Sequence, residues 1–174
     1  MKILSKVEWK ATAEDPKPDV SFVPPMERRR LTGVERAALS VAHRALEQFR
    51  QSGDSDGRPI PVVFASRWGE IGTTVKLMLQ MHAEGEMSPA GFSNSVHNAT
   101  PGHLSLLTKN TAPYTAIAAG PDSYDMGLLE ASTYPGRVLF VYAEEETPAF
   151  YRPYFPDPGP ARAVAMVIAT SVYI

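Results

Sequence analysis

The sequence contains no cysteine. This absence excludes disulfide bonds, thiolate metal sites and every mechanism that depends on a cysteine nucleophile. A large excess of charge of one sign is also lacking, because 17 Lys and Arg stand against 19 Asp and Glu and give a net charge of −2. Such a chain has no broad positive field to hold a nucleic-acid backbone, and we expect no nucleic-acid partner.

Long hydrophobic runs are missing as well. The first apolar run is interrupted by Ser5, Lys6 and Glu8, unlike a secretory signal. No apolar segment approaches the roughly 20 residues that cross a bilayer. We therefore expect a cytoplasmic protein with no membrane span. With 44% apolar and 21% charged residues in 174, the composition is typical of one globular domain, which we assign to residues 1–174.

The first half of the chain carries a clear helix signal. A proline-rich stretch, 16–25, predicts a loop. After it, Thr32 and Glu35 have the spacing of a capping box, in which a hydroxyl and a carboxylate satisfy the free amide hydrogens at a helix start. Apolar residues then recur at helical spacing as far as Phe49, and the run SGDSDG at 52–57 ends the helix.

The remaining segments alternate between strand and helix patterns. PVVFAS at 61–66 is a short apolar run of the kind buried on both faces of a parallel sheet. The order βαβαβαββ predicts an α/β fold, a mixed and mostly parallel five-stranded sheet covered by helices. The expected strands are 2–9, 61–66, 114–119, 137–145 and 161–174, and the expected later helices are 70–82, 100–108 and 123–131, with a loop at 84–98.

One segment carries a resemblance to a known family. APYTAIAAGPDSYDMGLLEA, at 112–131, resembles the nucleophile segment of the β-ketoacyl synthases, where a strand leads into A-C-(A/S)-S-G and a helix that ends in E-A. Pro113, Ser123, Glu130 and Ala131 stand in register with that pattern. The similarity extends to SRWGE at 66–70, to FSNSVHNATPG at 92–102 and to the last two strands, and there it is closest to the chain length factors of aryl polyene and other fatty-acid-like pathways.

The resemblance implies a single half of the thiolase-like fold and no condensing activity. The family's cysteine falls at Pro121, or at Gly120 if the alignment shifts by one, and neither residue can attack a thioester. Full synthases carry two histidines and a lysine in a second half that this sequence does not include. We therefore expect a non-catalytic partner subunit, or chain length factor, in acyl-chain synthesis, without a cofactor.

Four residues are expected to lie in a pocket near the position of the family's cysteine: Asp122, Ser123, His97 and Asn98. We expect Asp122 or Ser123 to cap the helix that follows, and His97 to bond the backbone. The competing hypothesis is a small thioesterase or acyltransferase that uses Ser123 or His97, although no G-x-S-x-G elbow exposes a serine. The four histidines lack metal-ligand spacing, so we expect no metal site.

The resemblance also implies a partner. Related synthases pair through the strand before the nucleophile, and the following helix packs against its counterpart from the second half. The expected interface comprises Tyr114, Thr115, Ala116, Ile117, Ala118, Tyr124, Met126 and Leu128. The partner is a full-length β-ketoacyl synthase in a heterodimer, or a second copy in a homodimer. A self-associating acyl-binding module is a third possibility.

Two charged runs complete the sequence. Arg28, Arg29 and Arg30 form the only dense basic run, either a solvated face or a docking patch for an acyl carrier protein or its phosphopantetheine phosphate. The acidic run AEEET at 143–147 follows a predicted strand, and we expect it to be exposed.

Overall fold

The computed structural model describes residues 1–155 and 159–170. Its sheet has the strand order β1-β5-β4-β2-β3. The strands are β1 (Lys2–Lys10), β2 (Val62–Ala65), β3 (Tyr114–Ile117), β4 (Gly136–Glu144) and β5 (Arg162–Thr170). The helices are α1 (Pro25–Arg28), α2 (Gly33–Gln51), α3 (Ile71–Glu84), α4 (Pro89–Ser93), α5 (Ala99–Thr108) and α6 (Ser123–Thr133), with short 3-10 turns η1 (Gly120–Asp122) and η2 (Arg152–Tyr154).

The predicted α/β fold with a mixed five-stranded sheet is confirmed. Among the described residues β2 pairs in parallel with β3 and β4, whereas β5 pairs antiparallel with β4 and β1. Only half of these pairings are parallel, because no helix separates β4 from β5 to carry the chain back across the sheet. The predicted end of the last strand, 171–174, lies outside the described residues.

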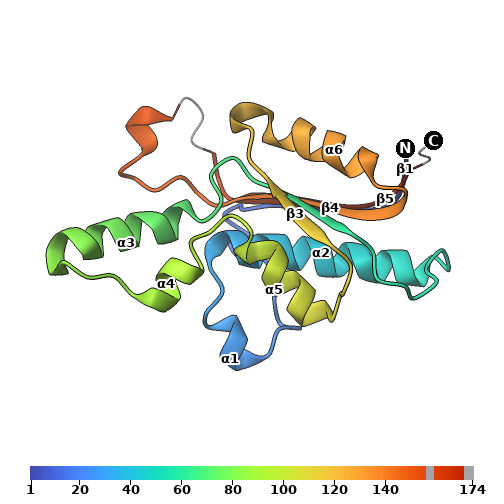
Figure 1. The fold of residues 1–174 in the computed structure, drawn as a ribbon, viewed down its shortest axis with the longest axis horizontal. Helices are drawn as coiled ribbons and strands as arrows, with labels where there is room; N and C mark the ends of the chain where they lie inside the picture. Colours follow the sequence, from blue (N-terminus) through green and yellow to red (C-terminus); the bar gives the residue numbers. More distant parts are fainter. Residues whose placement is uncertain (156–158, 171–174) are drawn as a thin grey trace.

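Helices cover both faces of the sheet (Figure 1). On one face, α2 and α5 pack over a core that includes Val62, Phe64 and Leu139. On the other face α6 lies over Val63, Ala65 and their neighbours. Consecutive residues of β2 thus enter opposite cores, and all four are buried, as predicted for a strand covered on both sides.

The capping box at the start of α2 is present in full. The amide of Glu35 donates to Thr32 Oγ1 at 3.2 Å, and the amide of Thr32 donates to Glu35 Oε2 at 2.8 Å. The helix buries Val34, Ala37, Ala38, Val41, Ala45, Leu46 and Phe49, which are the residues of the predicted apolar stripe.

Two predicted features differ from the structure. The segment 84–98, expected to be a loop, contains α4, which begins at Pro89 with the Ser88 hydroxyl accepting a hydrogen bond from the amide of Gly91 at 3.1 Å. A proline in the first turn behind a serine cap is a helix-start signal that the glycines nearby obscured. The strand predicted at 114–119 ends at Ile117, since the chain leaves the sheet before it turns at Gly120.

Candidate functional site

The turn between β3 and α6 contains Gly120 and Pro121, where the family resemblance leads us to expect a degenerate nucleophile position. Gly120 has a φ of +58°, a left-handed conformation that glycine adopts without a steric penalty. Pro121 and Asp122 are exposed, and neither offers a nucleophilic sulfur or hydroxyl. The turn therefore forms a strand-to-helix elbow in which Gly120 and Pro121 offer no sulfur or hydroxyl nucleophile.

Ser123 closes this turn and is not available for chemistry. Its side chain accepts a hydrogen bond from the amide of Ala119 at 2.9 Å and donates one to the carbonyl of Gly120 at 2.7 Å. The residue is 1% exposed. The hydroxyl is thus committed to the backbone, a structural role as expected, although it ties the turn together and does not cap the helix.

The expectation that Asp122 caps α6 is wrong. Asp122 stands at the N-cap position, but its side chain makes no capping hydrogen bond. Its backbone, with φ −89° and ψ 8°, continues the 3-10 turn, whereas a capping residue has extended backbone that aims its side chain at the free amides. The chain enters α6 directly from η1, and this geometry leaves the Asp122 carboxylate in solvent.

The ends of β2, β3 and β4 meet at one edge of the sheet, because these three strands are parallel. There the carbonyl of Ile117 accepts hydrogen bonds from the amide of Ser66 at 3.1 Å and from His97 Nε2 at 3.1 Å. His97 also packs against Gly69, where an added Cβ would lie 2.5 Å from Nδ1. As predicted, this histidine bonds the backbone.

The hydrogen-bonded pair of Ser123 and His97 that the competing hydrolase hypothesis needs is not formed. Both residues lie in the described part of the chain, and no hydrogen bond joins Ser123 and His97. The neighbouring hydroxyls of Ser93 and Ser95 donate to the carbonyls of Pro89 and Phe92 instead. Asn98 is exposed and makes no side-chain cap at the start of α5.

Two carboxylates at the end of β4 anchor this edge. The Glu144 carboxylate accepts hydrogen bonds from Ser66 Oγ at 3.2 Å and from the amide of Arg67. Glu145 accepts from the amide of Gly72 at 2.6 Å, in the first turn of α3. Burial raises the pKa of both carboxyls. The expectation that the whole run 143–147 is exposed is therefore wrong, because the first two glutamates fold back to satisfy backbone amides.

A third buried carboxyl, Glu70, lies between α2 and α5. It accepts hydrogen bonds from Thr32 at 3.0 Å, from Thr100 at 3.3 Å and from Thr73 at 3.4 Å. It is 2% exposed. Burial, followed by repulsion from the nearby carboxylate of Glu35, raises its pKa to about 8. This raised pKa favours the protonated, neutral form of Glu70 at pH 7.

Glu35 is fully buried beside this group and lies against the imidazole of His103. His103 Nδ1 lies 2.5 Å from Glu35 Oε1, and this hydrogen bond raises the pKa of the histidine. The network of Glu35, Glu70, His103 and the threonines was not predicted. A signal for its first member was present, because Glu35 precedes the apolar Ala38 and Leu39 by three and four residues and so belongs to the buried stripe.

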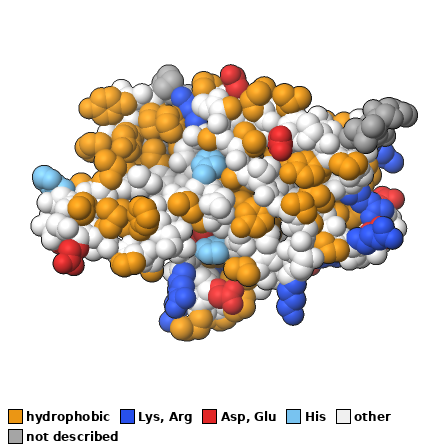
Figure 2. Space-filling view, in the orientation of Figure 1, with side chains coloured by type: hydrophobic (Ala, Val, Ile, Leu, Met, Phe, Trp, Pro, Cys, Tyr) orange, Lys and Arg blue, Asp and Glu red, His pale blue; other side chains and the backbone are white. Residues whose placement is uncertain are grey.

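The expected partner interface lies on exposed or half-buried residues. β3 is an edge strand whose neighbour in the sheet is β2. Tyr114 and Ala118 are exposed, and Thr115, Ala116 and Ile117 are half-buried. Figure 2 shows hydrophobic side chains at several places on the face where β3 and α5 lie in front.

The helix α6 is packed on one side. Gly127 and Ala131 face the sheet and are buried, and Tyr124 and Leu128 are half-buried against the same core. Met126 and Leu129 remain 40% and 59% exposed. Apolar residues therefore lie on more than one side of this helix, and within the described residues Met126 and Leu129 on its outer side are left uncovered.

The basic run lies at the end of α1. Arg29 and Arg30 are exposed and Arg28 is half-buried, and the carbonyl of Arg28 accepts a hydrogen bond from Arg36. Among the described residues no group of three or more His, Cys, Asp and Glu side chains is arranged to hold a metal ion. Within the same residues no helix is long and apolar enough to cross a membrane.

Comparison with known proteins agrees with this geometry. The family model described as β-ketoacyl synthase, N-terminal domain, matches residues 4–173. Among solved structures, a ketosynthase (ApeO) in complex with its chain length factor (ApeC) from Xenorhabdus doucetiae matches with a TM-score of 0.74 and 29% identity, over 86% of this chain and 62% of that chain. No curated protein matches the sequence.

Two more distant structures share the fold. A type II polyketide complex, AntDE:AntF, in which an acyl carrier protein is bound to its ketosynthase, matches with a TM-score of 0.66 and 17% identity over 85% of this chain and 49% of that chain. The ishigamide ketosynthase/chain length factor matches with a TM-score of 0.60 and 16% identity over 84% and 43%. The chain thus spans less than two thirds of the length of each of these structures.

Proposed function

The chain belongs to the β-ketoacyl synthase N-terminal-domain family, and on that premise we propose that it is a non-catalytic partner subunit of a full-length β-ketoacyl synthase. In this proposal residues 1–174 form a single domain that acts as a chain length factor in fatty-acid- or polyene-type acyl chain synthesis in the cytoplasm. The 29% identity to a chain of a solved complex between a ketosynthase and its chain length factor supports this assignment.

The observation that carries the proposal is the elbow between β3 and α6. A condensing enzyme must hold the growing chain on a nucleophile at this position, and the residues here are Gly120 and Pro121. The nearest hydroxyl, that of Ser123, is buried and bonded to the backbone on both sides. A subunit with this elbow can shape a pocket or hold a partner, and the chemistry is left to the partner.

The edge strand supports pairing with a second chain. The carbonyls of Pro113 and Ile117 accept hydrogen bonds from the amides of Val62 and Ser66, at the two ends of β2. Because backbone groups alternate in direction along a strand, those of Tyr114, Ala116 and Ala118 point away from β2. A row of outward donors and acceptors with no charged side chain among them is a template for another strand.

A proline at Ala116 is expected to weaken pairing while the fold is kept. The substitution Ala116→Pro removes one outward amide hydrogen and leaves the bonds to β2 in place, which an edge strand tolerates. Native mass spectrometry of the chain co-expressed with a full-length β-ketoacyl synthase should show a one-to-one complex for the wild type. The complex should weaken at least tenfold for the proline variant, an effect of about 1.4 kcal/mol.

The matched control is Ala116→Ser, which keeps the outward amide and should pair like the wild type. Circular dichroism of both variants checks that the sheet is intact. A wild-type chain that stays monomeric beside the synthase would contradict the partner role, and a complex of two copies of this chain in place of the synthase would identify a self-associating module.

Arg28, Arg29 and Arg30 are proposed to receive an acyl carrier protein. Arginine side chains pair with carboxylate and phosphate groups, and Arg29 and Arg30 are exposed. Reversing the charge of Arg29 and Arg30 to Glu is expected to weaken carrier-protein binding by about tenfold at low salt, since each exposed pair contributes up to about 1 kcal/mol. Lys17→Glu, exposed in the proline-rich segment, is the control, and equal affinity for both variants would remove this patch from the proposal.

A further inference from the structure

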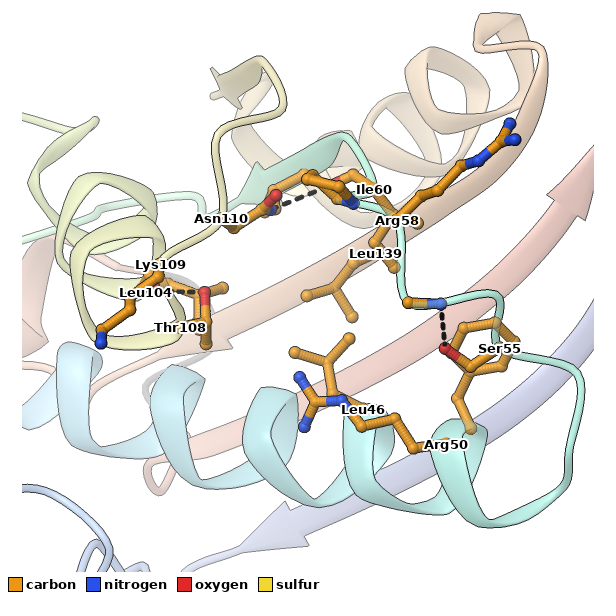
Figure 3. Close-up of a pocket in the computed structure, with 14 residues that line it drawn as sticks. Leu46, Arg50, Ser55, Arg58, Ile60, Leu104, Thr108, Lys109, Asn110 and Leu139 are labelled. Carbon is orange, nitrogen blue, oxygen red and sulfur yellow. Dashed lines mark hydrogen bonds between the residues drawn. The ribbon is translucent and has the colours of Figure 1, made fainter.

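A cavity of about 130 Å³ lies at the amino end of β2, the opposite end of the strand from the SRWGE turn (Figure 3). Its walls come from the second half of α2, the end of α5 and the loop before β2. No role in the proposed partner function requires this cavity, so the inference below stands independently of that function.

The inner wall of the cavity is apolar. The side chains of Leu46, Leu104 and Leu139 point toward its centre in Figure 3. They are 9%, 4% and 1% exposed, and Phe49 and Val62 beside them are buried as well. A well-defined apolar cavity of about 150 Å³ binds a molecule as large as benzene, so this one has room for an apolar group of about six carbons.

The mouth of the cavity is basic. Arg50, Arg58 and Lys109 line it. Within the described residues Arg50 and Lys109 form no ion pair, while Arg58 lies 3.8 Å from an Asp56 carboxylate that is closer, at 2.8 Å, to Arg137. Figure 3 shows the Arg50 guanidinium beside Leu46, where it borders the apolar wall.

The rim is held in place by hydrogen bonds. Asn110 Nδ2 donates to the carbonyl of Ile60 at 2.8 Å and ties the end of α5 to the loop before β2. Lys109 itself ends α5 with a φ of +53°, a left-handed conformation that is sterically unfavourable for a residue with a Cβ. The chain thus keeps a cation at the mouth where glycine would fit the backbone better.

We propose that this cavity binds a small monocarboxylate of about six carbons in all, with an apolar tail. The tail lies against Leu46, Leu104 and Leu139, and the carboxylate pairs with the guanidinium of Arg50. An apolar wall next to a guanidinium that forms no ion pair within the described residues fits a ligand with an apolar tail and a negative charge. The tail leaves water, and the carboxylate gains a charge-assisted hydrogen bond.

The test is an NMR titration of the 174-residue chain with hexanoate. Methyl signals of Leu46, Leu104, Leu139 and Val62 are expected to shift together and saturably. Arg50→Gln should weaken hexanoate binding by about tenfold, because a hydrogen bond between charged groups is lost while solvent at the mouth already weakens that bond. Leu46→Phe, which fills the cavity, should abolish the shifts.

Three comparisons separate this site from general surface binding. Arg44→Gln, an exposed arginine on the same helix, should leave the affinity within twofold. Acetate, which has no tail, and 1-hexanol, which has no charge, should each bind at least tenfold more weakly than hexanoate. Shifts scattered over the surface, equal binding of hexanol, or an Arg50→Gln variant with unchanged affinity would overturn the proposal.

Discussion

The free energy of unfolding is expected to fall as the pH rises from about 5 to about 8, with Glu70 as the largest single cause. The Glu70 carboxyl has a pKa of about 8 in the folded chain, against an ordinary value of 4.5, because it is buried and lies near the Glu35 carboxylate. Between these values the unfolded chain has lost the proton and the folded chain retains it. Stability therefore decreases by about 1.4 kcal/mol per pH unit in this window, on the order of 4 kcal/mol in all.

Three other groups with raised pKa values, Glu144, Glu145 and His103, act in the same direction. The pKa values of Glu144 and Glu145 are raised by burial, so their contributions also decline as the pH rises above 4.5. The raised pKa of His103 gives a contribution that is complete below 6.5 and is lost as the pH rises through its folded pKa. In the Glu70→Gln variant, the free energy of unfolding should still decrease with rising pH because of these three groups. The decrease should be smaller than in the wild type, because the contribution of Glu70 is absent.

Urea unfolding at pH 5, 7 and 9 measures this effect. Glu70→Gln should match the wild type within about 1 kcal/mol at pH 5 and exceed its stability by a few kcal/mol at pH 9, because a neutral amide has no proton to lose. Glu86→Gln, at an exposed position, is the control and should follow the wild-type profile. A Glu70→Gln variant whose stability falls as steeply as that of the wild type would show that this carboxyl is ionised in the folded chain.

The second large effect is expected at Gly127, where α6 approaches the sheet. A Cβ added here would lie 2.6 Å from the Cβ of Ala65 and 2.7 Å from Cε2 of Phe140. Both neighbours belong to the core, which has no room to yield. Gly127→Ala should therefore destabilise the chain by about 1–3 kcal/mol, although alanine is the better helix former.

Gly102→Ala provides a control with the opposite sign. Gly102 is also inside a helix, α5, but its Cβ would meet only the Tyr114 hydroxyl, at an ordinary contact distance of 3.4 Å. This substitution should stabilise the chain by about 0.5–1 kcal/mol through helix propensity alone. Thermal unfolding of both variants is the measurement. A Gly127→Ala variant as stable as Gly102→Ala would mean that α6 does not lie this close to the sheet.

The parts of the fold that depend on local signals were predictable from the sequence. Thr32 and Glu35 satisfy amides of their own helix start, and the apolar run at β2 needs cover on both faces wherever the strand lies. The edge position of β3 followed from the family resemblance and agrees with the strand order. These features could be predicted because they depend only on residues close together in the sequence or on the known topology of the family.

The buried polar network could not be predicted in the same way. The pKa of Glu70 is raised because burial and the nearby Glu35 carboxylate disfavour its charge, against the opposing hydrogen bonds from Thr32 and Thr100, and these groups come from the start of α2 and from α5. Glu144 is buried because amides after β2 lie across the sheet edge from the end of β4. Both environments depend on tertiary contacts that leave no mark on the local sequence, and for Asp122 the 3-10 turn overrides the usual capping preference.

Intact-mass spectrometry of the purified chain, incubated with acyl and malonyl carrier protein in the absence of any other synthase, tests most directly whether the chain is non-catalytic. We predict no acyl adduct on the chain and no elongated product, because the elbow at Gly120 and Pro121 offers no atom to carry the acyl group. A covalent adduct of acyl mass on this chain, or an elongated product formed in its presence alone, would contradict the account.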